Sequence, residues 1–254
     1  MRLFSDSKIY VFCPSNYRTG GPEALHQLCS QLIQFGANAY MLYFSNNPKF
    51  NPNDPVENSY KKYHLPYTFN FDDSERNIVV IPETCGKYLY STKKAQRVFW
   101  WLSVDHYIDD ISISINALKF NTLSAPMPKI FYFGKGDDDV IHFAQSEYAR
   151  QFLKLNGVPD HKIYMLEECI NPTYFSHAAH IDLSRKENIV VYNRQKGFEV
   201  TQQLMRFAPD IDWRPIEKPE LMTPEQVQEL LERAKVYIDF GYFPESCSLP
   251  LLRK

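Results

Sequence analysis

Two consecutive glycines, Gly20 and Gly21, lie where a predicted strand gives way to a predicted helix. Residues 9–12 combine β-branched and aromatic side chains, which is typical of a strand packed on a pleated surface. Apolar residues then recur at steps of three and four, which places them on one face of a helix that covers the sheet: Leu25, Leu28, Leu32 and Phe35. Helix-terminal N–H groups at such a junction can bind a phosphate or a sugar hydroxyl. A glycine pair also forms plain turns, and the GxGxxG spacing of dinucleotide sites is absent.

Acidic residues and a histidine follow two further predicted strands. Residues 77–82 (NIVVIP) and 97–104 (RVFWWLSV) are almost wholly apolar, as strands buried on both faces are. Glu83 comes directly after the first, and Asp105 and His106 come directly after the second. Open parallel sheets bind their ligands at the carboxyl ends of the strands, so these side chains are candidate site residues. A lone histidine is also a common structural residue.

The elements that would position these residues alternate between strands and helices. Gly36 ends the first helix and residues 37–44 form the next strand, so a parallel βαβ unit opens the chain. Residues 45–66 are rich in Asn and Pro and are interpreted as a surface excursion, either a lip over a cleft or a plain loop. Residues 107–139 are predicted to be irregular. Further elements are predicted at 87–96 (helix), 140–144 (strand), 147–155 (helix) and 162–166 (strand). The pattern indicates one doubly wound domain over residues 1–175.

A second unit of the same type is predicted to follow. Residues 176–187 are polar and mixed in charge, and we interpret them as a linker. Residues 188–254 then begin a second α/β domain, with strands at 188–192, 211–216 and 235–241 and helices at 197–207 and 223–234. These 67 residues are about half the ~100–150 of a typical domain, so we expect the second domain to be incomplete.

Composition excludes several classes of function. The 28 basic and 30 acidic residues give a net charge of −2, without the basic stripe of a nucleic-acid binder. The five cysteines are an odd number without a CxxC pair, which favours reduced thiols in the cytoplasm. No apolar run approaches the ~18–20 residues that span a bilayer. We therefore expect a cytoplasmic protein with at most peripheral contact on the inner face of a membrane.

Three segments, in this order, resemble retaining glycosyltransferases of the GT-B fold, family 4-like. Residues 20–42 (GGPEALHQLCSQLIQFGANAYML) resemble the opening glycine pair, Leu-rich helix and second strand of that family. Residues 157–175 (GVPDHKIYMLEECINPTYF) are similar to its hinge segment. Residues 192–205 (YNRQKGFEVTQQLM) are similar to the start of its donor-binding domain. The resemblance covers nearly the whole chain and implies two Rossmann-like doubly wound domains.

The resemblance also implies a function and a set of site residues. The family transfers a sugar from a nucleotide-sugar to a glycan or lipid-linked acceptor, as in surface polysaccharide synthesis, generally without a metal or other cofactor. Arg194 and Lys196 match positions that stabilise the charge gathering on the leaving diphosphate, and Gly20 and Gly21 belong to the phosphate-binding set. His106 matches a histidine that contacts the donor sugar and is the candidate catalytic residue.

Other features leave alternatives open. Glu83 and Asp105 could hold acceptor hydroxyls. The acidic triplet 137–139 would suit the metal of a GT-A transferase, although its surroundings favour a solvated loop. After residue 245 the relatives continue into more of the donor domain, whereas this chain ends in SCSLPLLRK. We therefore expect a truncated transferase, either active or inactive in this form. A non-catalytic α/β module that binds a glycan or a protein is the alternative.

Overall fold

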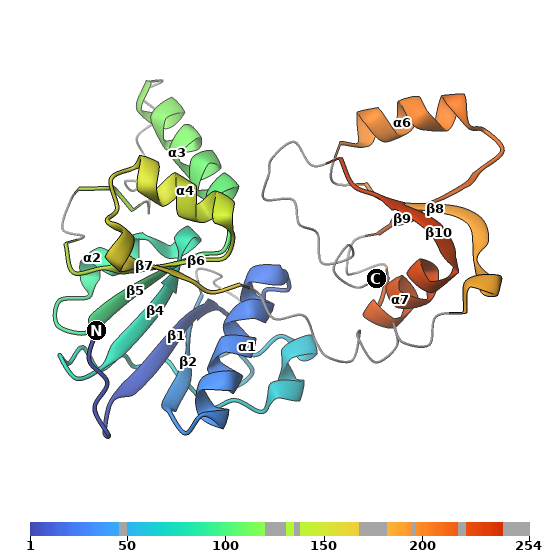
Figure 1. Cartoon of the computed structure of the whole chain (residues 1–254). Coiled ribbons are helices and arrows are strands. Elements are labelled where there is room, and N and C mark those ends of the chain that lie inside the picture. The colour runs from blue at the N-terminus through green and yellow to red at the C-terminus, as the bar shows by residue number, and fades with distance from the viewer. Residues whose placement is uncertain are drawn as a thin grey trace. The chain divides into compact units, whose positions relative to one another are not determined.

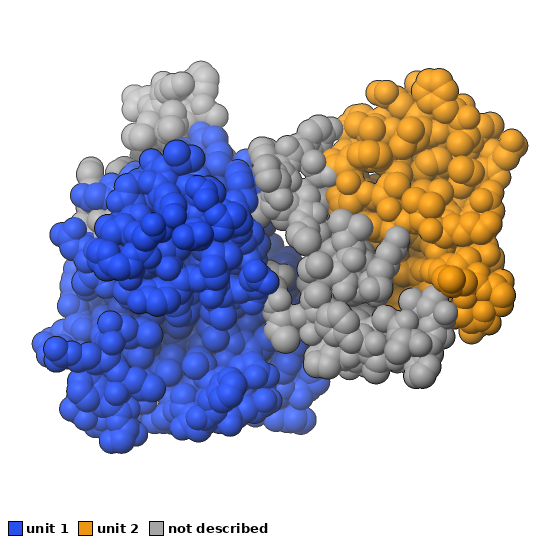
Figure 2. Space-filling view, viewed as in Figure 1, with its two compact units in different colours: residues 1–168 blue, residues 169–254 orange. Residues whose placement is uncertain are grey.

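The structure is a computed structural model, and it forms two compact units, residues 1–168 and residues 169–254 (Figure 2). It describes the chain except residues 46–49, 120–130, 135–137, 168–181, 195–196, 218–221 and 241–254, and for residues 113–119 and 224 it describes the backbone only. Half of the predicted linker, residues 176–181, lies outside the described residues. Each unit is described by itself. Among the described residues, no helix combines the length and apolar character needed to cross a bilayer.

Unit 1 is built on a seven-stranded parallel sheet in the order β3-β2-β1-β4-β5-β6-β7 (Figure 1). The chain runs outward from β1 in one direction, returns to the centre, and runs outward from β4 in the other. This is the doubly wound arrangement, in which parallel strands are joined by crossovers that carry helices. The strands are β1 (Lys8–Pro14), β2 (Asn38–Phe44), β3 (Tyr67–Thr68), β4 (Ile78–Pro82), β5 (Gln96–Trp101), β6 (Ile141–Ala144) and β7 (Ile163–Met165).

Helices cover both faces of this sheet, so alternate side chains of one strand enter two different cores. On β1, Val11 packs with α1 (Gly20–Gln34), whereas Phe12 packs on the other face. That other face is covered by α2 (Lys87–Ser91), α3 (Val104–Lys119) and α4 (Glu147–Leu155). All five residues of β4 are buried, as a strand covered on both faces requires.

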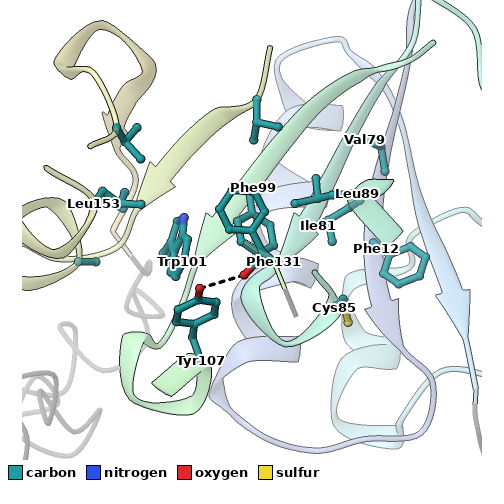
Figure 3. Close-up of a cluster of buried hydrophobic side chains, with 14 of the residues drawn as sticks. Phe12, Val79, Ile81, Cys85, Leu89, Phe99, Trp101, Tyr107, Phe131 and Leu153 are labelled. Atoms are coloured by element: carbon teal, nitrogen blue, oxygen red, sulfur yellow. Dashed lines mark hydrogen bonds between the residues drawn. The ribbon is translucent and has the colours of Figure 1, made fainter. Parts of the chain in front are cut away.

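An aromatic cluster fills the second of these cores (Figure 3). The Phe99 ring lies 5.0 Å from the Trp101 ring and 4.9 Å from the Phe131 ring, measured between centroids. The Tyr107 hydroxyl donates to the Phe131 carbonyl oxygen over 2.9 Å, so the one polar group of this tyrosine is satisfied inside the cluster. The cluster therefore ties α3 and the segment at Phe131 to the interior strand β5.

Three local predictions for unit 1 are wrong. Residues 104–119, most of them expected to be irregular, form α3, because Ser103 caps it with a bond from the His106 N–H (3.2 Å) and the chain keeps a helical apolar period through Val104 and Tyr107. The helix predicted at 87–96 stops at Ser91. Phe35 does not cover the sheet: α1 ends at Gln34, and the Phe35 side chain is 86% exposed.

Unit 2 has a three-stranded parallel sheet in the order β10-β8-β9, with β8 in the centre. Its strands are β8 (Glu187–Asn193), β9 (Asp212–Ile216) and β10 (Ala234–Ile238), and its helices are α6 (Phe198–Phe207) and α7 (Pro224–Arg233). Thr223 caps α7, and its side chain and that of Gln226 form a reciprocal capping box. Val227 and Leu231 of α7 pack on Ile189 and Val191 of β8, which forms the core of this unit.

Candidate functional site

The carboxyl edge of the unit 1 sheet brings the glycine pair close to the turn after β5. The strand order reverses between β1 and β4, and open α/β sheets bind ligands beside such a reversal. Gly20 and Gly21 are the first residues of α1, directly beyond the β1 loop. A Cβ added at Gly21 would lie 3.6 Å from Leu102 Cδ1, an ordinary contact, so Leu102 packs against the start of α1.

Glu83 lies beneath the same turn and holds it. The residue is only 4% exposed, and its Oε2 accepts the Leu102 backbone N–H over 3.0 Å. It begins the 3-10 turn Glu83–Cys85 that follows β4, and α3 packs against this turn. A buried carboxylate needs hydrogen bonds to offset its lost hydration, which the turn supplies in part. The acceptor-binding role of Glu83 stays a prediction.

Asp105 and His106 lie in the first turn of α3. The Tyr148 hydroxyl of α4 is 3.5 Å from Asp105 Oδ1, and His106 is exposed. One turn further on, burial raises the pKa of Asp110; Asp109 raises it further, while His106 lowers it. An exposed imidazole beside carboxylates on one helix face can hold or move a proton. Glu83 thus lies in the turn after β4, and Asp105 and His106 lie in the first turn of α3, which packs against that turn.

The β1–α1 loop is fixed by the surface excursion. The Tyr60 hydroxyl donates to the Thr19 carbonyl oxygen (2.8 Å) and accepts the Thr19 N–H (3.2 Å). The Asn16 N–H donates to the Pro55 carbonyl oxygen over 3.0 Å, and Asn16 Nδ2 donates to the Asp54 carbonyl oxygen over 3.1 Å. Sequence reasoning missed Tyr60, because nothing in the sequence of this segment distinguishes it from the nearby Tyr63.

In unit 2, Arg194 follows the central strand β8. Its Nη1 lies 3.4 Å from Glu217 Oε1, at the end of β9, and its guanidinium carbon lies 5.5 Å from the centroid of the Phe198 ring. The Arg194 side chain is 55% exposed, so this ion pair contributes little and a stronger anion can replace it. Lys196 lies outside the described residues. Arg194 therefore stands at the carboxyl edge of its sheet, where a ligand of this fold would be expected.

Gly197 brings the loop after β8 against the segment after β10. Its φ of +56° is in the left-handed region, and a Cβ there would lie 2.2 Å from the Phe240 carbonyl oxygen. Only glycine satisfies both conditions without a shift of the backbone. The close approach fixes the backbone at Gly197, three residues after Arg194.

A hollow of about 510 Å³ lies at the opposite, amino edge of the unit 1 sheet. It is lined by the first residues of β5 and β6 and by several cations, two of which are engaged in ion pairs. Arg76 Nε bonds both carboxylate oxygens of Asp6 at 3.0 Å, and Arg97 bonds Asp139 and, at 3.2 Å, the Leu89 carbonyl oxygen. None of the predicted site residues lines it. Within the described ranges, no three His, Cys, Asp or Glu side chains gather as metal ligands.

These features define a class of fold: α/β, with a Rossmann-like parallel sheet in unit 1 and a smaller parallel sheet in unit 2, as the sequence predicted. No protein-family model matches the chain, and no curated protein sequence matches it significantly. Among solved structures, the chain is similar to HepE of Anabaena, crystallised in complex with UDP-glucose. The two are 10% identical with a TM-score of 0.50, over 97% of this chain and 77% of HepE. At this identity the likeness shows a shared fold.

Proposed function

We propose that this chain is a GT-B-type glycosyltransferase that moves a sugar from a nucleotide-sugar to a glycan or lipid-linked acceptor in surface polysaccharide synthesis. The observation that carries the proposal is the fold shared over 97% of the chain with a protein solved with UDP-glucose bound. The order of the three family-like segments supports it independently. We place the reaction in the cytoplasm or peripherally at the inner face of the membrane.

In the proposed reaction, the bond from the sugar to the nucleotide diphosphate breaks and negative charge gathers on the leaving phosphate. Fixed cations lower the energy of that transition state. Arg194 is assigned this role with Lys196, and the exposed Arg194–Glu217 ion pair leaves its guanidinium able to exchange a carboxylate for a diphosphate. The N–H groups at Gly20 and Gly21 are assigned to a phosphate oxygen, since the first N–H groups of a helix have no intrahelical acceptor.

The remaining site residues are assigned to the sugar and the acceptor. His106 contacts the donor sugar from the first turn of α3, where it is exposed. Asp105 accepts a hydrogen bond from an acceptor hydroxyl beside Tyr148. Glu83 contributes to the acceptor side while also holding the Leu102 N–H. No metal enters this scheme.

The first test is calorimetric titration of the purified chain with UDP, GDP and their sugars, with EDTA present. We expect saturable binding of one nucleotide and its sugar. A chain shown to be folded that binds neither nucleotide refutes the donor site and favours a non-catalytic module that binds a glycan or a protein.

Substitution of Arg194 tests its assignment, and Arg214 offers a matched control. Both arginines are about half exposed (side chains 55% and 56%), and each forms an exposed ion pair, Arg214 with Asp212 on β9. We expect Arg194→Ala to weaken UDP-glucose binding about tenfold or more, since a charge-assisted bond contributes about 1.5–3 kcal/mol. Arg214→Ala should leave the Kd unchanged. Equal changes in Kd for the two substitutions would show that Arg194 does not bind the diphosphate.

A further inference from the structure

The surface excursion between β2 and β3 returns to the candidate site and grips the loop before α1. Its 3-10 turn, Asn58–Tyr63, carries Tyr60, whose residue surface is only 3% exposed although the segment around it is polar. The Tyr60 and His26 rings pack with centroids 4.5 Å apart and planes inclined by 32°. Packing on the helix side therefore sets the direction of the Tyr60 hydroxyl.

That hydroxyl meets both polar groups of a single peptide residue. It accepts the Thr19 N–H at 3.2 Å and donates to the Thr19 carbonyl oxygen at 2.8 Å. A hydroxyl has one proton to donate and lone pairs to accept, so the two bonds are compatible. The same Thr19 carbonyl oxygen also accepts the Glu23 N–H over 3.3 Å, the first bond of α1. Tyr60 thus fixes the orientation of the peptide group at which α1 begins.

Thr19 is the N-cap residue of α1, but its own side chain makes no capping bond. An N-cap without a side-chain bond leaves the first turn of a helix prone to fray. Tyr60 supplies an anchor from a distant segment, and the two Asn16 bonds to Asp54 and Pro55 hold the start of the same loop. The N–H groups of Gly20 and Gly21 follow directly, so their directions depend on this anchor.

We propose that Tyr60 is a positioning residue that preorganises the Thr19-Gly20-Gly21 turn for the diphosphate of the nucleotide-sugar. The inference rests on the proposed function, because it deepens the description of the same site. A turn that is already ordered before the ligand arrives loses no further conformational entropy at binding. The affinity for the ligand is therefore higher than it would be with a disordered turn. Tyr60 does not touch the ligand in this scheme; it acts through the backbone of Thr19.

The test compares Tyr60→Phe with the wild type, with Tyr164→Phe as the matched control. Phe keeps the ring that packs on His26 and removes only the hydroxyl. Tyr164 lies on β7, the edge strand at the far end of the sheet, and is 53% exposed. Two measurements are made on each full-length protein: the Kd of UDP-glucose by calorimetry, and hydrogen exchange of peptides that cover residues 15–25 and, for comparison, β4.

We expect Tyr60→Phe to weaken UDP-glucose binding by about three- to tenfold, because a turn that has lost both Tyr60 bonds must be ordered when the ligand binds. UDP should lose the same factor, whereas uridine, which lacks the diphosphate, should bind the variant as it binds the wild type. Exchange should accelerate at Thr19 while β4 keeps its protection. Tyr164→Phe should change none of these.

Each other outcome overturns the inference in a distinguishable way. Unchanged exchange at Thr19 means that Tyr60 does not order the turn. Faster exchange with a Kd within twofold of the wild type means that the turn does not serve the ligand. An equal loss of affinity for uridine means that Tyr60 does not act through the diphosphate. Failure of the folded wild type to bind any nucleotide refutes the proposed function itself, and this inference with it.

Discussion

Acidification should destabilise unit 1 through His26, which is buried in its neutral form. The residue is 2% exposed, and its Nδ1 lies 2.6 Å from the Pro22 carbonyl oxygen. A carbonyl oxygen only accepts, so Nδ1 carries the proton, and Nε2 accepts the Tyr43 hydroxyl over 2.6 Å. Burial lowers the pKa of His26 from 6.5 to about 4, although the bond to Pro22 and the charge of Glu57 act in the opposite direction.

The size and sign of the effect follow from the two pKa values. The unfolded chain takes up this proton near pH 6.5, but the folded chain takes it up only near pH 4. Stability is therefore complete above about pH 6.5 and falls as the pH drops toward 4. A gap of about 2.5 pH units corresponds to about 3 kcal/mol in full, of which about 2 kcal/mol is lost between pH 7 and pH 5.

Urea unfolding at the two pH values measures this loss. Trp213 belongs to unit 2, so a Trp213→Phe background lets the fluorescence of Trp100 and Trp101 report unit 1 alone. In that background His26→Gln removes the titrating ring, and His161→Gln removes an exposed histidine as a control. In the Trp213→Phe background and in His161→Gln, the free energy of unfolding should fall between pH 7 and pH 5. In His26→Gln that fall should be smaller by about 2 kcal/mol. The same fall in all three proteins would refute the buried neutral state of His26.

Three further substitutions test packing and turn geometry. Gly197→Ala should destabilise unit 2 by about 2–3 kcal/mol, because it combines a left-handed backbone with a Cβ 2.2 Å from the Phe240 carbonyl oxygen; thermal unfolding at the wild-type Tm would contradict this. Phe99→Ala should lower the free energy of unfolding in urea by about 3–5 kcal/mol, since the side chain is fully buried among aromatic rings. A loss under about 1 kcal/mol would mean that the core refills the space. Asp73→Ala should lower the free energy of unfolding by about 1–2 kcal/mol, because the Asp73 carboxylate accepts the N–H groups of residues 93–95 over 2.8–3.0 Å. Fast hydrogen exchange of these three N–H groups in the wild type would argue against those bonds.

The strands were largely predictable because burial on both faces leaves a plain pattern in the sequence. Strand β4 is apolar throughout, and its position followed from that alone. The helix α3 was missed although its signals are local: Ser103 as the cap, then the buried Val104 and Tyr107 three residues apart. The cause of the early end of α2 is not local in the sequence, because Asp73 fixes the turn at Lys93 from twenty residues away.

The candidate site was predictable only as far as it depends on strand ends. Glu83 bonds the backbone N–H of Leu102 and Gly21 lies beside its side chain, because parallel strands deliver their carboxyl ends to one edge. The hydrogen bonds between Tyr60 and Thr19 join residues 41 positions apart, and no periodicity in either segment predicts them. Arg194 was found by family resemblance, but its ion pair with Glu217 depends on how β8 and β9 align.

The position of β1 between β2 and β4 sets an order of events for a chain leaving the ribosome. Residues 1–68 can assemble β1, β2 and β3 as soon as they emerge, but one side of β1 stays unpaired until β4 arrives, when Ile9 aligns with Ile78. Contacts so distant along the chain form slowly, since loop closure precedes the gain from pairing. During that interval the nascent chain exposes the unpaired edge of a strand whose five middle residues are buried in the folded protein, which is the form of intermediate that chaperones bind.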